Sequence, residues 1–581
     1  MHSGLTLVAT LTVSVFFVPD SSAFQLDLTR SKTDANATRP YAVAADAGGN
    51  AFVVGAVSDH FAADMISGTT AQRVWSYRVG NGTAMAVDIG PDQHPVVAGE
   101  VFVDGFADTF VVKISPETGE EVWRNSVPTA GSIFVGGPRH VAVDGSGNAV
   151  VSARYFGLRL FSGSDGSEIW HHDPGILDIT GLSVRPGEFV VTGNPSAAKW
   201  VVAKHDLSDG SEVWRQEFPG LVARGFDVRF DAAGDVVALG QVIDSFGMLS
   251  WHCEVAKLSG ITGAVIWRER IGQTSEGAFA RQSLALAQDG DAIVNVGLTP
   301  IGLVLTRLES ADGSEAWRTE YPAASGGEER RLVAVDGSDD VIAVSGMEDD
   351  FLVVKLDGSS GAQVWSADLN GRRVPSASER YAALALDPAG GPFIFAGLQN
   401  VVTASDFVRA NTLTKLSPDG ADLIPGRRLK LRSNPPAGTR LSLVARDGIN
   451  FWPETASDPT SGGALLEVRN PGTGEITSVP LPAAQWTAKK VSGINRELRY
   501  SSSGAACDRI ILRPRYLSIR CLALGFTLDE AAQGSIAVRL TTGAGAGARR
   551  YCLAFGGTST RDEPGSFQAV RADVPVACPF P

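Results

Sequence analysis

The side chains that could perform chemistry are few and scattered along the 581 residues. The eight histidines include one local cluster, His171-His172-Asp173, which directly follows Trp170. Successive side chains of a β-strand point to opposite faces, so two adjacent histidines cannot easily share one metal ion. We therefore interpret this cluster as an exposed strand end and predict no metal site there.

Two acidic segments have the spacing of a cation-binding loop. Asp144-Gly-Ser-Gly-Asn148 and Asp336-Gly-Ser-Asp-Asp340 carry oxygen donors at alternate positions, as Ca²⁺ loops do. Neither segment continues to the glutamate of an EF-hand loop. Since tight turns also favour Asp, Asn and Gly, turn formation alone explains both segments, and the sequence leaves calcium binding open.

Motifs for catalysis are absent from the sequence. It contains no H-E-x-x-H, no G-x-S-x-G, no Walker A motif and no C-x-x-C-H haem signature. Paired carboxylates that would cleave a glycosidic bond cannot be recognised in a sequence, because their separation is a three-dimensional quantity. We predict no catalytic residue, no cofactor and no metal, and we keep an unrecognised enzyme as an alternative.

The five cysteines indicate disulfides rather than nucleophiles. Cys507, Cys521, Cys552 and Cys578 cluster near the C-terminus, and an even cluster in an exported protein is typical of two disulfides. Three pairings are possible, and proximity favours Cys507–Cys521 with Cys552–Cys578. The fifth, Cys253, lies in an apolar-alternating stretch, where a buried thiol is the simpler interpretation.

The elements that would position any site come from an internal repeat. Six segments carry a glycine four residues before a tryptophan, and an earlier copy has Ala71 at the glycine position. A last copy, residues 417–424, keeps Gly420 but has Ile424 at the tryptophan position. The spacing of 44 to 53 residues suits one four-stranded propeller blade. The seven tryptophans are Trp75, Trp123, Trp170, Trp214, Trp267, Trp317 and Trp365.

A second motif alternates with the first and consists of a strand, a turn usually rich in Asp and Gly, and another strand. It occurs eight times, so each repeat is predicted to contain two hairpins. The sequence therefore predicts an all-β fold whose residues 24–426 form an eight-bladed β-propeller, with seven blades as the alternative. The degenerate copies predict weaker packing where the ring closes, offset by a strand from 24–30 or by the C-terminal domain.

The D-G-x-x-x-W and T-G-x-x-x-W copies resemble the tryptophan-docking repeats of quinoprotein-type propellers. That family contains the pyrroloquinoline-quinone (PQQ) dehydrogenases and non-catalytic bacterial relatives, including outer-membrane assembly lipoproteins. The resemblance covers about residues 41–425 and implies that each tryptophan packs against the neighbouring blade. The catalytic members stack PQQ on a disulfide between adjacent cysteines, but the propeller region here has Cys253 alone, so PQQ is not expected.

The flanking regions complete the predicted organisation. Residues 4–18 are apolar and precede small residues, which predicts a signal peptide over 1–23 and an extracellular or periplasmic protein. No other apolar run reaches 18 residues, so no transmembrane segment is expected. Residues 427–581 contain short strand-like runs between Gly- and Pro-rich turns, which predicts a β-sandwich with two disulfides.

Charge and motif content limit the function classes. Residues 1–426 carry 30 basic and 52 acidic side chains, which argues against a nucleic-acid partner. An intact fold signal without catalytic motifs predicts a secreted binding protein that contacts a protein or glycan through the propeller loops. The alternatives are a cell-envelope assembly scaffold, although no lipid-anchor cysteine follows the apolar run, and an atypical PQQ-dependent or carbohydrate-active enzyme.

Overall fold

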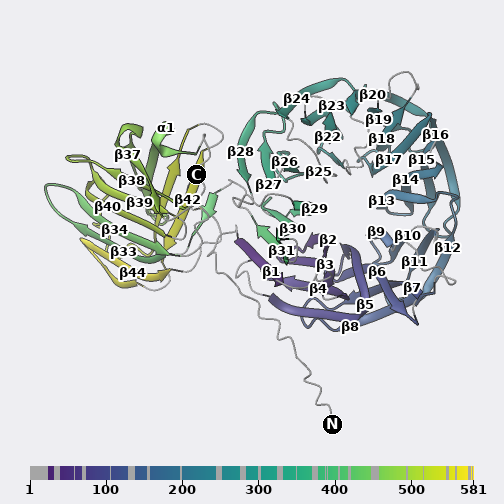
Figure 1. Ribbon diagram of the computed structural model, residues 1–581, viewed down its shortest axis with the longest axis horizontal. Coiled ribbons are helices and arrows are strands. Elements are labelled where there is room, and N and C mark those ends of the chain that lie inside the picture. The colour runs from purple at the N-terminus through teal and green to yellow at the C-terminus, as the bar shows by residue number, and fades with distance from the viewer. Residues whose placement is uncertain are drawn as a thin grey trace, which may run out of the picture.

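The computed structural model describes the chain in two β-rich parts, a ring of small sheets and a sandwich of two larger sheets (Figure 1). It describes all residues except 1–23, 32–38, 58, 69–72, 105, 129–137, 154–156, 197–198, 244–250, 275–282, 299–301, 323–330, 348–349, 369–376, 387, 389, 404–405, 416–420, 425, 447–456, 492–494, 514–515, 545–547, 557–558, 573–577, 579 and 581. The predicted signal peptide lies outside the described residues. The described part contains no helix with the length and hydropathy needed to cross a membrane.

The ring begins with a seven-stranded antiparallel sheet. Its strand β5 is long enough to be the outer strand of one four-stranded unit and, after residue 81, the inner strand of the next. The sheet consists of β2 (Arg39–Ala45), β3 (Ala51–Val57), β4 (His60–Ile66), β5 (Arg73–Ile89), β6 (Pro95–Val103), β7 (Phe106–Ile114) and β8 (Glu121–Val127).

Five further sheets in the described residues each contain four consecutive antiparallel strands. They are β9 (Pro138–Val143), β10 (Ala149–Ala153), β11 (Gly157–Phe161) and β12 (Glu168–His172); β13 (Asp178–Arg185), β14 (Glu188–Ser196), β15 (Lys199–Asp206) and β16 (Glu212–Pro219); β17 (Val222–Phe230), β18 (Val236–Ile243), β19 (Trp251–Leu258) and β20 (Val265–Thr274); β21 (Ser283–Leu286), β22 (Ala292–Leu298), β23 (Gly302–Leu308) and β24 (Glu315–Pro322); and β25 (Arg331–Val335), β26 (Val341–Met347), β27 (Asp350–Leu356) and β28 (Gln363–Asp368).

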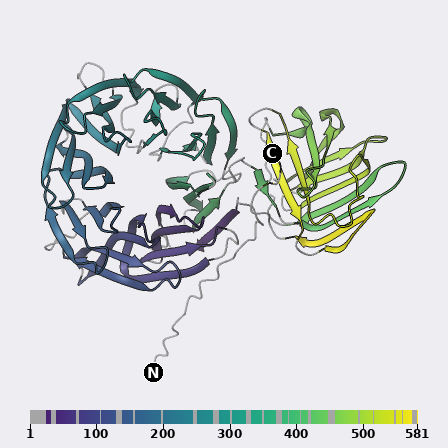
Figure 2. The same ribbon diagram turned by 180° about the vertical axis from the view of Figure 1, so that it is seen from behind.

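The sheets stand side by side around the ring, with the first strand of each toward the middle and the last strand at the rim (Figures 1 and 2). The two middle strands are almost entirely buried, as in β18, because a neighbouring sheet covers each face. Buried Val, Ile, Leu and Ala side chains of successive sheets form one apolar cluster after another around the ring. The region is thus a β-propeller; its total of eight blades stays a prediction.

The last sheet of the ring joins the two ends of the propeller region. Strands β29 (Ala377–Leu386), β30 (Pro392–Thr403) and β31 (Asp406–Lys415) are completed at the rim by β1 (Phe24–Ser31), which pairs antiparallel with β31. The inner strand β29 also lies beside β2 of the first sheet. An N-terminal strand therefore closes the ring, as expected from the degenerate last repeat.

The segment expected to end the last repeat lies elsewhere. Strand β32 (Ala421–Leu423) pairs in parallel with β42 (Arg549–Phe555) of the C-terminal region, and the Ile424 amide donates to the Cys552 carbonyl. Ile424 is fully buried in the C-terminal core. The expectation that it occupies a poorer tryptophan position at the ring closure was therefore wrong, because its strand pairs across the domain boundary.

The C-terminal region is a sandwich of a five-stranded and an eight-stranded sheet that share one apolar core. The smaller sheet, in spatial order, contains β32, β42 (Arg549–Phe555), β41 (Ile536–Thr542), β35 (Ala464–Arg469) and β36 (Ile476–Leu481). The larger contains β37 (Trp486–Val491), β38 (Asn495–Ser501), β39 (Cys507–Arg513), β40 (Tyr516–Leu524), β34 (Thr439–Arg446), β33 (Gly426–Ser433), β44 (Ser566–Ala572) and β43 (Ser559–Glu563). Two short helices, α1 (Pro459–Gly462) and η1 (Ala483–Gln485), connect strands.

Candidate functional site

The repeated tryptophans lie at the junctions between successive sheets. In six of the seven, the indole Nε1–H donates to a backbone carbonyl in the turn between the third and fourth strands of the next repeat. The pairs are Trp75 with Pro116 (2.8 Å), Trp123 with Gly163 (3.1 Å), Trp170 with Leu207 (2.9 Å), Trp214 with Gly260 (3.1 Å), Trp267 with Ser310 (3.0 Å) and Trp317 with Gly358 (2.7 Å).

The glycine of each motif lies under the tryptophan of the preceding repeat. Gly263 has φ +72°, and a Cβ added there would lie 2.7 Å from Trp214, so both the backbone and the space require glycine. The same holds for Gly119, Gly166, Gly210, Gly313 and Gly361 against Trp75, Trp123, Trp170, Trp267 and Trp317. Trp365 is also buried, but the turn that would cover it, 417–420, lies outside the described residues.

A buried cation shares the tryptophan's carbonyl at several junctions. The Lys257 ammonium donates to the Ser310 carbonyl (3.2 Å), which Trp267 also binds, and lies 2.9 Å from the Asp231 carboxylate. Corresponding groups are Lys113 with Gly163 and Asp92, Lys204 with Gly260 and Glu188, and Arg307 with Gly358, Asp289 and Asp291. The sequence contains a signal for these cations, because a basic residue stands ten positions before five of the seven tryptophans.

One of the two calcium-like segments holds such a cation. The Asp336 carboxylate accepts the amides of Ser338 and Asp340, and its other oxygen lies 2.7 Å from the Lys355 ammonium. Lys355 is also 3.1 Å from Asp340. Burial lowers the pKa of Lys355, but the hydrogen bonds and charges of these two carboxylates outweigh it and raise the pKa, so the amine stays charged.

The other calcium-like segment is a turn held by its own carboxylate. Asp144 accepts hydrogen bonds from the amides of Ser146 and Asn148 and from the Asn148 side chain. Asn148 in turn accepts the Gly163 amide. Within the residues that the structure describes, no group of three or more His, Cys, Asp or Glu side chains is placed to hold a metal ion.

Two carboxylates of the inner strands have raised pKa values. Burial raises the pKa of Asp88 on β5 and of Asp227 on β17, and the Arg229 charge opposes both shifts. Each also accepts a backbone amide from the inner strand of the next sheet, Val143 for Asp88 (2.8 Å) and Leu284 for Asp227 (3.1 Å). These carboxylates therefore connect neighbouring inner strands, a role that the sequence search did not identify.

The adjacent histidines point in different directions. His171 is exposed, and its Nδ1 lies 3.0 Å from Glu168, whereas His172 packs edge-to-face against His205 with ring centres 5.4 Å apart. The two therefore do not share a site, as strand geometry predicted. The partner of His172, the fully buried His205 on β15, was not singled out from the sequence.

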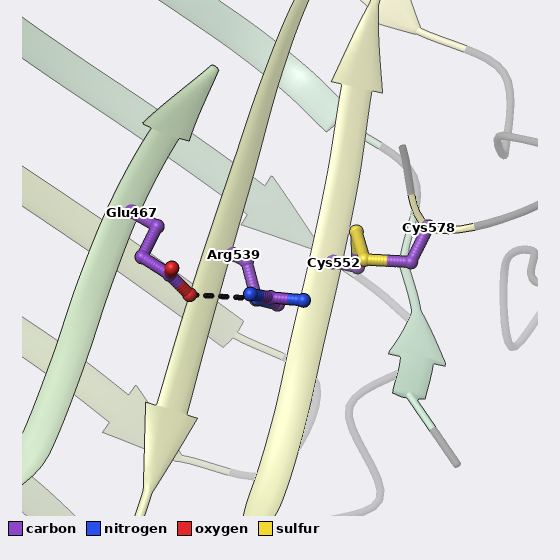
Figure 3. The surroundings of a disulfide bond; sticks show 4 residues. All are labelled: Glu467, Arg539, Cys552 and Cys578. Atoms are coloured by element: carbon purple, nitrogen blue, oxygen red, sulfur yellow. Dashed lines mark hydrogen bonds and ion pairs between the residues drawn. A yellow bond between two sulfur atoms is a disulfide. The ribbon is translucent and has the colours of Figure 1, made fainter. Parts of the chain in front are cut away.

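The cysteines pair as proximity predicted. Cys507 binds Cys521 between β39 and β40, and Cys552 on β42 binds Cys578, which confirms both disulfides. Figure 3 shows the second bond beside the ion pair of Glu467 and Arg539, which joins β35 to β41. Cys253 is fully buried in an apolar cluster and takes part in neither disulfide.

The two ends of the ring differ in construction. Since the strands alternate in direction, the Asp-rich turns and the glycine turns all lie at one end, which we name the turn end. The opposite end, the loop end, carries the second-to-third-strand loops and the connections between sheets. The described connections differ in length, with residues 173–177 joining β12 to β13 and residues 220–221 joining β16 to β17, whereas most described glycine turns have the same six-residue length.

Exposed apolar side chains mark one hairpin of the loop end. Phe102, Val103 and Phe106 at the tip of β6 and β7 are 45%, 46% and 43% exposed. Asp104 in the turn between these strands has a φ of +50°. Loops carried by a rigid scaffold are where binding residues concentrate, so this tip is a candidate contact surface.

Comparison with known proteins agrees with this architecture. A protein-family model described as outer membrane protein assembly factor BamB matches residues 41–216, 156–346 and 197–454, which together span more than half of the chain. No curated protein matches the chain.

Two solved structures illustrate the likeness. BamB from Moraxella catarrhalis has 13% identity and covers 68% of this chain and 100% of its own, with a TM-score of 0.40. Quinohemoprotein alcohol dehydrogenase from Comamonas testosteroni has 12% identity and covers 69% of this chain and 78% of its own, with a TM-score of 0.40. On the match to the family model, the chain belongs to the family of PQQ-type β-propellers that the BamB model describes.

Proposed function

We propose that this protein is an exported, non-catalytic interaction scaffold that binds a protein partner through the loop end of its propeller. The single observation that carries the proposal is the contrast between the two ends of the ring. The turn end is built from uniform motif turns, whereas the loop end has connections of unequal length and the exposed tip of Phe102, Val103 and Phe106. Exposed aromatic side chains are typical of protein interfaces.

The family and the redox chemistry support this proposal. The family model is named for an outer membrane protein assembly factor. An assembly scaffold, like a binding protein, would use a rigid ring that presents loops to its partner. Two disulfides are typical of proteins outside the reducing cytosol, which supports a periplasmic or secreted location. Cys253 is the only cysteine of the propeller region in the sequence, which argues against the PQQ-dehydrogenase alternative.

The proposal can be tested by affinity capture with the mature chain, residues 24–581, as bait in the native envelope fraction or culture medium. Phe102→Ser/Phe106→Ser removes the apolar tip without changing a buried residue. The control is Val122→Ser on the rim strand β8, which removes an aliphatic side chain of similar exposure, 48%. Capture of one specific protein should fall at least tenfold with the double variant and remain unchanged with the control.

The opposite pattern would contradict the proposal. If the double variant captures its partner as well as the wild type, the tip is not the contact surface. If both variants lose capture equally, binding depends on general surface hydrophobicity rather than on the loop end.

A further inference from the structure

One position of the repeat carries a histidine where six other copies are apolar. The last residue of the third strand in these six copies is a buried aliphatic or aromatic residue: Ile66, Ile114, Phe161, Leu258, Leu308 and Leu356. The last copy, β31, ends in Lys415 instead. In the sheet of β13–β16 the strand pairing places His205 at this position, opposite Glu212, just as Ile114 lies opposite Glu121. An apolar side chain therefore suffices for the fold, so packing alone does not require the imidazole.

The hydrogen bonding of His205 fixes which ring nitrogen is available. Its Nδ1 lies 3.0 Å from the Gly210 carbonyl, which can only accept, so Nδ1 carries the proton and Nε2 has a lone pair. Nε2 is buried and has no hydrogen-bond partner in the described part of the protein. A backbone carbonyl on one ring nitrogen and a free lone pair on the other is the arrangement of a metal-ligating histidine.

A second imidazole lies beside the first, from the neighbouring sheet. His172, the last residue of β12, has its ring centre 5.4 Å from that of His205. Two imidazoles bound to one tetrahedral Zn²⁺ have centres about 5 Å apart, given Zn–N bonds of about 2 Å. His172 is half-buried, which gives an ion access from solvent.

The position of His172 in the repeat is also informative. It stands two residues after Trp170, where the corresponding Asn125 and Thr319 donate to the carbonyls of Gly166 and Gly361. At this junction the equivalent carbonyl, Gly210, is bound by His205 instead.

We propose that His172 and His205 together bind a divalent first-row transition-metal ion between the sheet of β9–β12 and the sheet of β13–β16. Two protein ligands leave the remaining coordination positions of the ion to water. Imidazole nitrogen suits Zn²⁺, Cu²⁺ and Ni²⁺, whereas Ca²⁺ and Mg²⁺ prefer oxygen ligands. Such an ion would link two sheets that the Trp170 indole already joins.

The test is a titration of the metal-free mature chain with Zn²⁺ by calorimetry, with Co²⁺ absorption as a spectroscopic probe. His205→Leu introduces the residue found in three other copies, and His172→Asn introduces the residue found in the second copy, so both variants suit the local fold. The matched control is His171→Asn, which removes the neighbouring exposed histidine. We expect one site per chain, weakened at least tenfold by either variant and unchanged by the control.

Three results would overturn the proposal. The first is a Zn²⁺ affinity of the wild type equal to that of His205→Leu. The second is a loss of Zn²⁺ affinity in His171→Asn as large as in His172→Asn. The third is a Co²⁺ spectrum that is identical in the wild type, His205→Leu and His172→Asn. Thermal unfolding of each variant without metal establishes that a lost site does not reflect a lost fold.

Discussion

At six junctions between successive repeats a backbone carbonyl accepts the tryptophan indole of the preceding repeat, and at four of them it also accepts a lysine or arginine. Between the sheets of β13–β16 and β17–β20, the Gly260 carbonyl accepts both the Trp214 indole (3.1 Å) and the Lys204 ammonium (2.6 Å). The Gly260 amide donates to Asp235 in its own sheet. The backbone of Gly260 thus ties together two sheets, while the motif glycine of the same turn, Gly263, leaves room for the Trp214 ring.

Replacing Trp214 with alanine should reduce the free energy of unfolding by roughly 3–5 kcal/mol, because a large buried side chain leaves a cavity. Trp214→Phe keeps most of the side-chain volume but removes the indole N–H that binds the Gly260 carbonyl. Loss of this hydrogen bond should reduce the free energy of unfolding by only about 1 kcal/mol. Chemical denaturation of the mature chain measures both. Equal and negligible changes would show that the tryptophans do not hold the ring together.

His205 should make stability depend on pH in a defined direction. Burial lowers its pKa from the usual 6.5 to about 4, so the folded state favours the neutral ring. The unfolded chain then takes up more protons between pH 6.5 and 4, and the free energy of unfolding should fall by up to about 3 kcal/mol across that window.

The measurement for His205 is thermal unfolding from pH 7 to pH 4 in the presence of a chelator. His205→Leu should lack this component of the pH dependence, whereas His171→Asn should retain it, because His171 is exposed. An identical pH profile for the wild type and His205→Leu would contradict the assignment.

The residue types explain what the sequence could predict at this scale. Trp214 and Gly263 are visible because each has a special shape requirement that no other residue type meets, so both recur at fixed spacing. Lys204, Lys257 and Arg307 were missed because the repeat tolerates Met65 and Leu160 at the same position. His205 is detectable only by aligning third strands and asking which copy departs from the apolar pattern.

At the level of strands, the ring depends on pairing between distant segments. β1 supplies the rim strand beside β31, and β32 leaves the ring to pair with β42. The sequence indicated the first pairing, since the last repeat lacked its tryptophan. It could not indicate the second, because a three-residue strand has no periodicity from which its partner can be read.

Removal of residues 24–31 should open the ring closure, since β31 would then present an unpaired edge. We expect a lower unfolding temperature and concentration-dependent aggregation, measured by calorimetry and light scattering. A synthetic peptide of the sequence Phe24–Ser31 should restore part of the lost stability. A truncated chain as stable and as soluble as the mature protein would show that β1 is dispensable.

The whole molecule combines a ring and a sandwich of different charge. Residues 1–426 carry 30 basic and 52 acidic side chains, a net charge of −22. Residues 427–581 carry 20 basic and 12 acidic side chains, a net charge of +8. The repeat period and the strand pattern predicted both parts, because propeller and sandwich cores need regular alternation. The contact surface was not predictable, because the tip of Phe102, Val103 and Phe106 is significant only through its place at one end of the ring.

The central claim, that partners bind at the loop end, is tested most directly by photo-crosslinking in the native cells. A photoreactive residue replaces Phe106 at the loop end in one strain and Ile261 at the turn end in another. Ile261 is 85% exposed and Phe106 is 43% exposed, so solvent accessibility alone would favour crosslinking at position 261. The account predicts a discrete protein adduct from position 106 and none from position 261. An adduct from position 261 alone would contradict it.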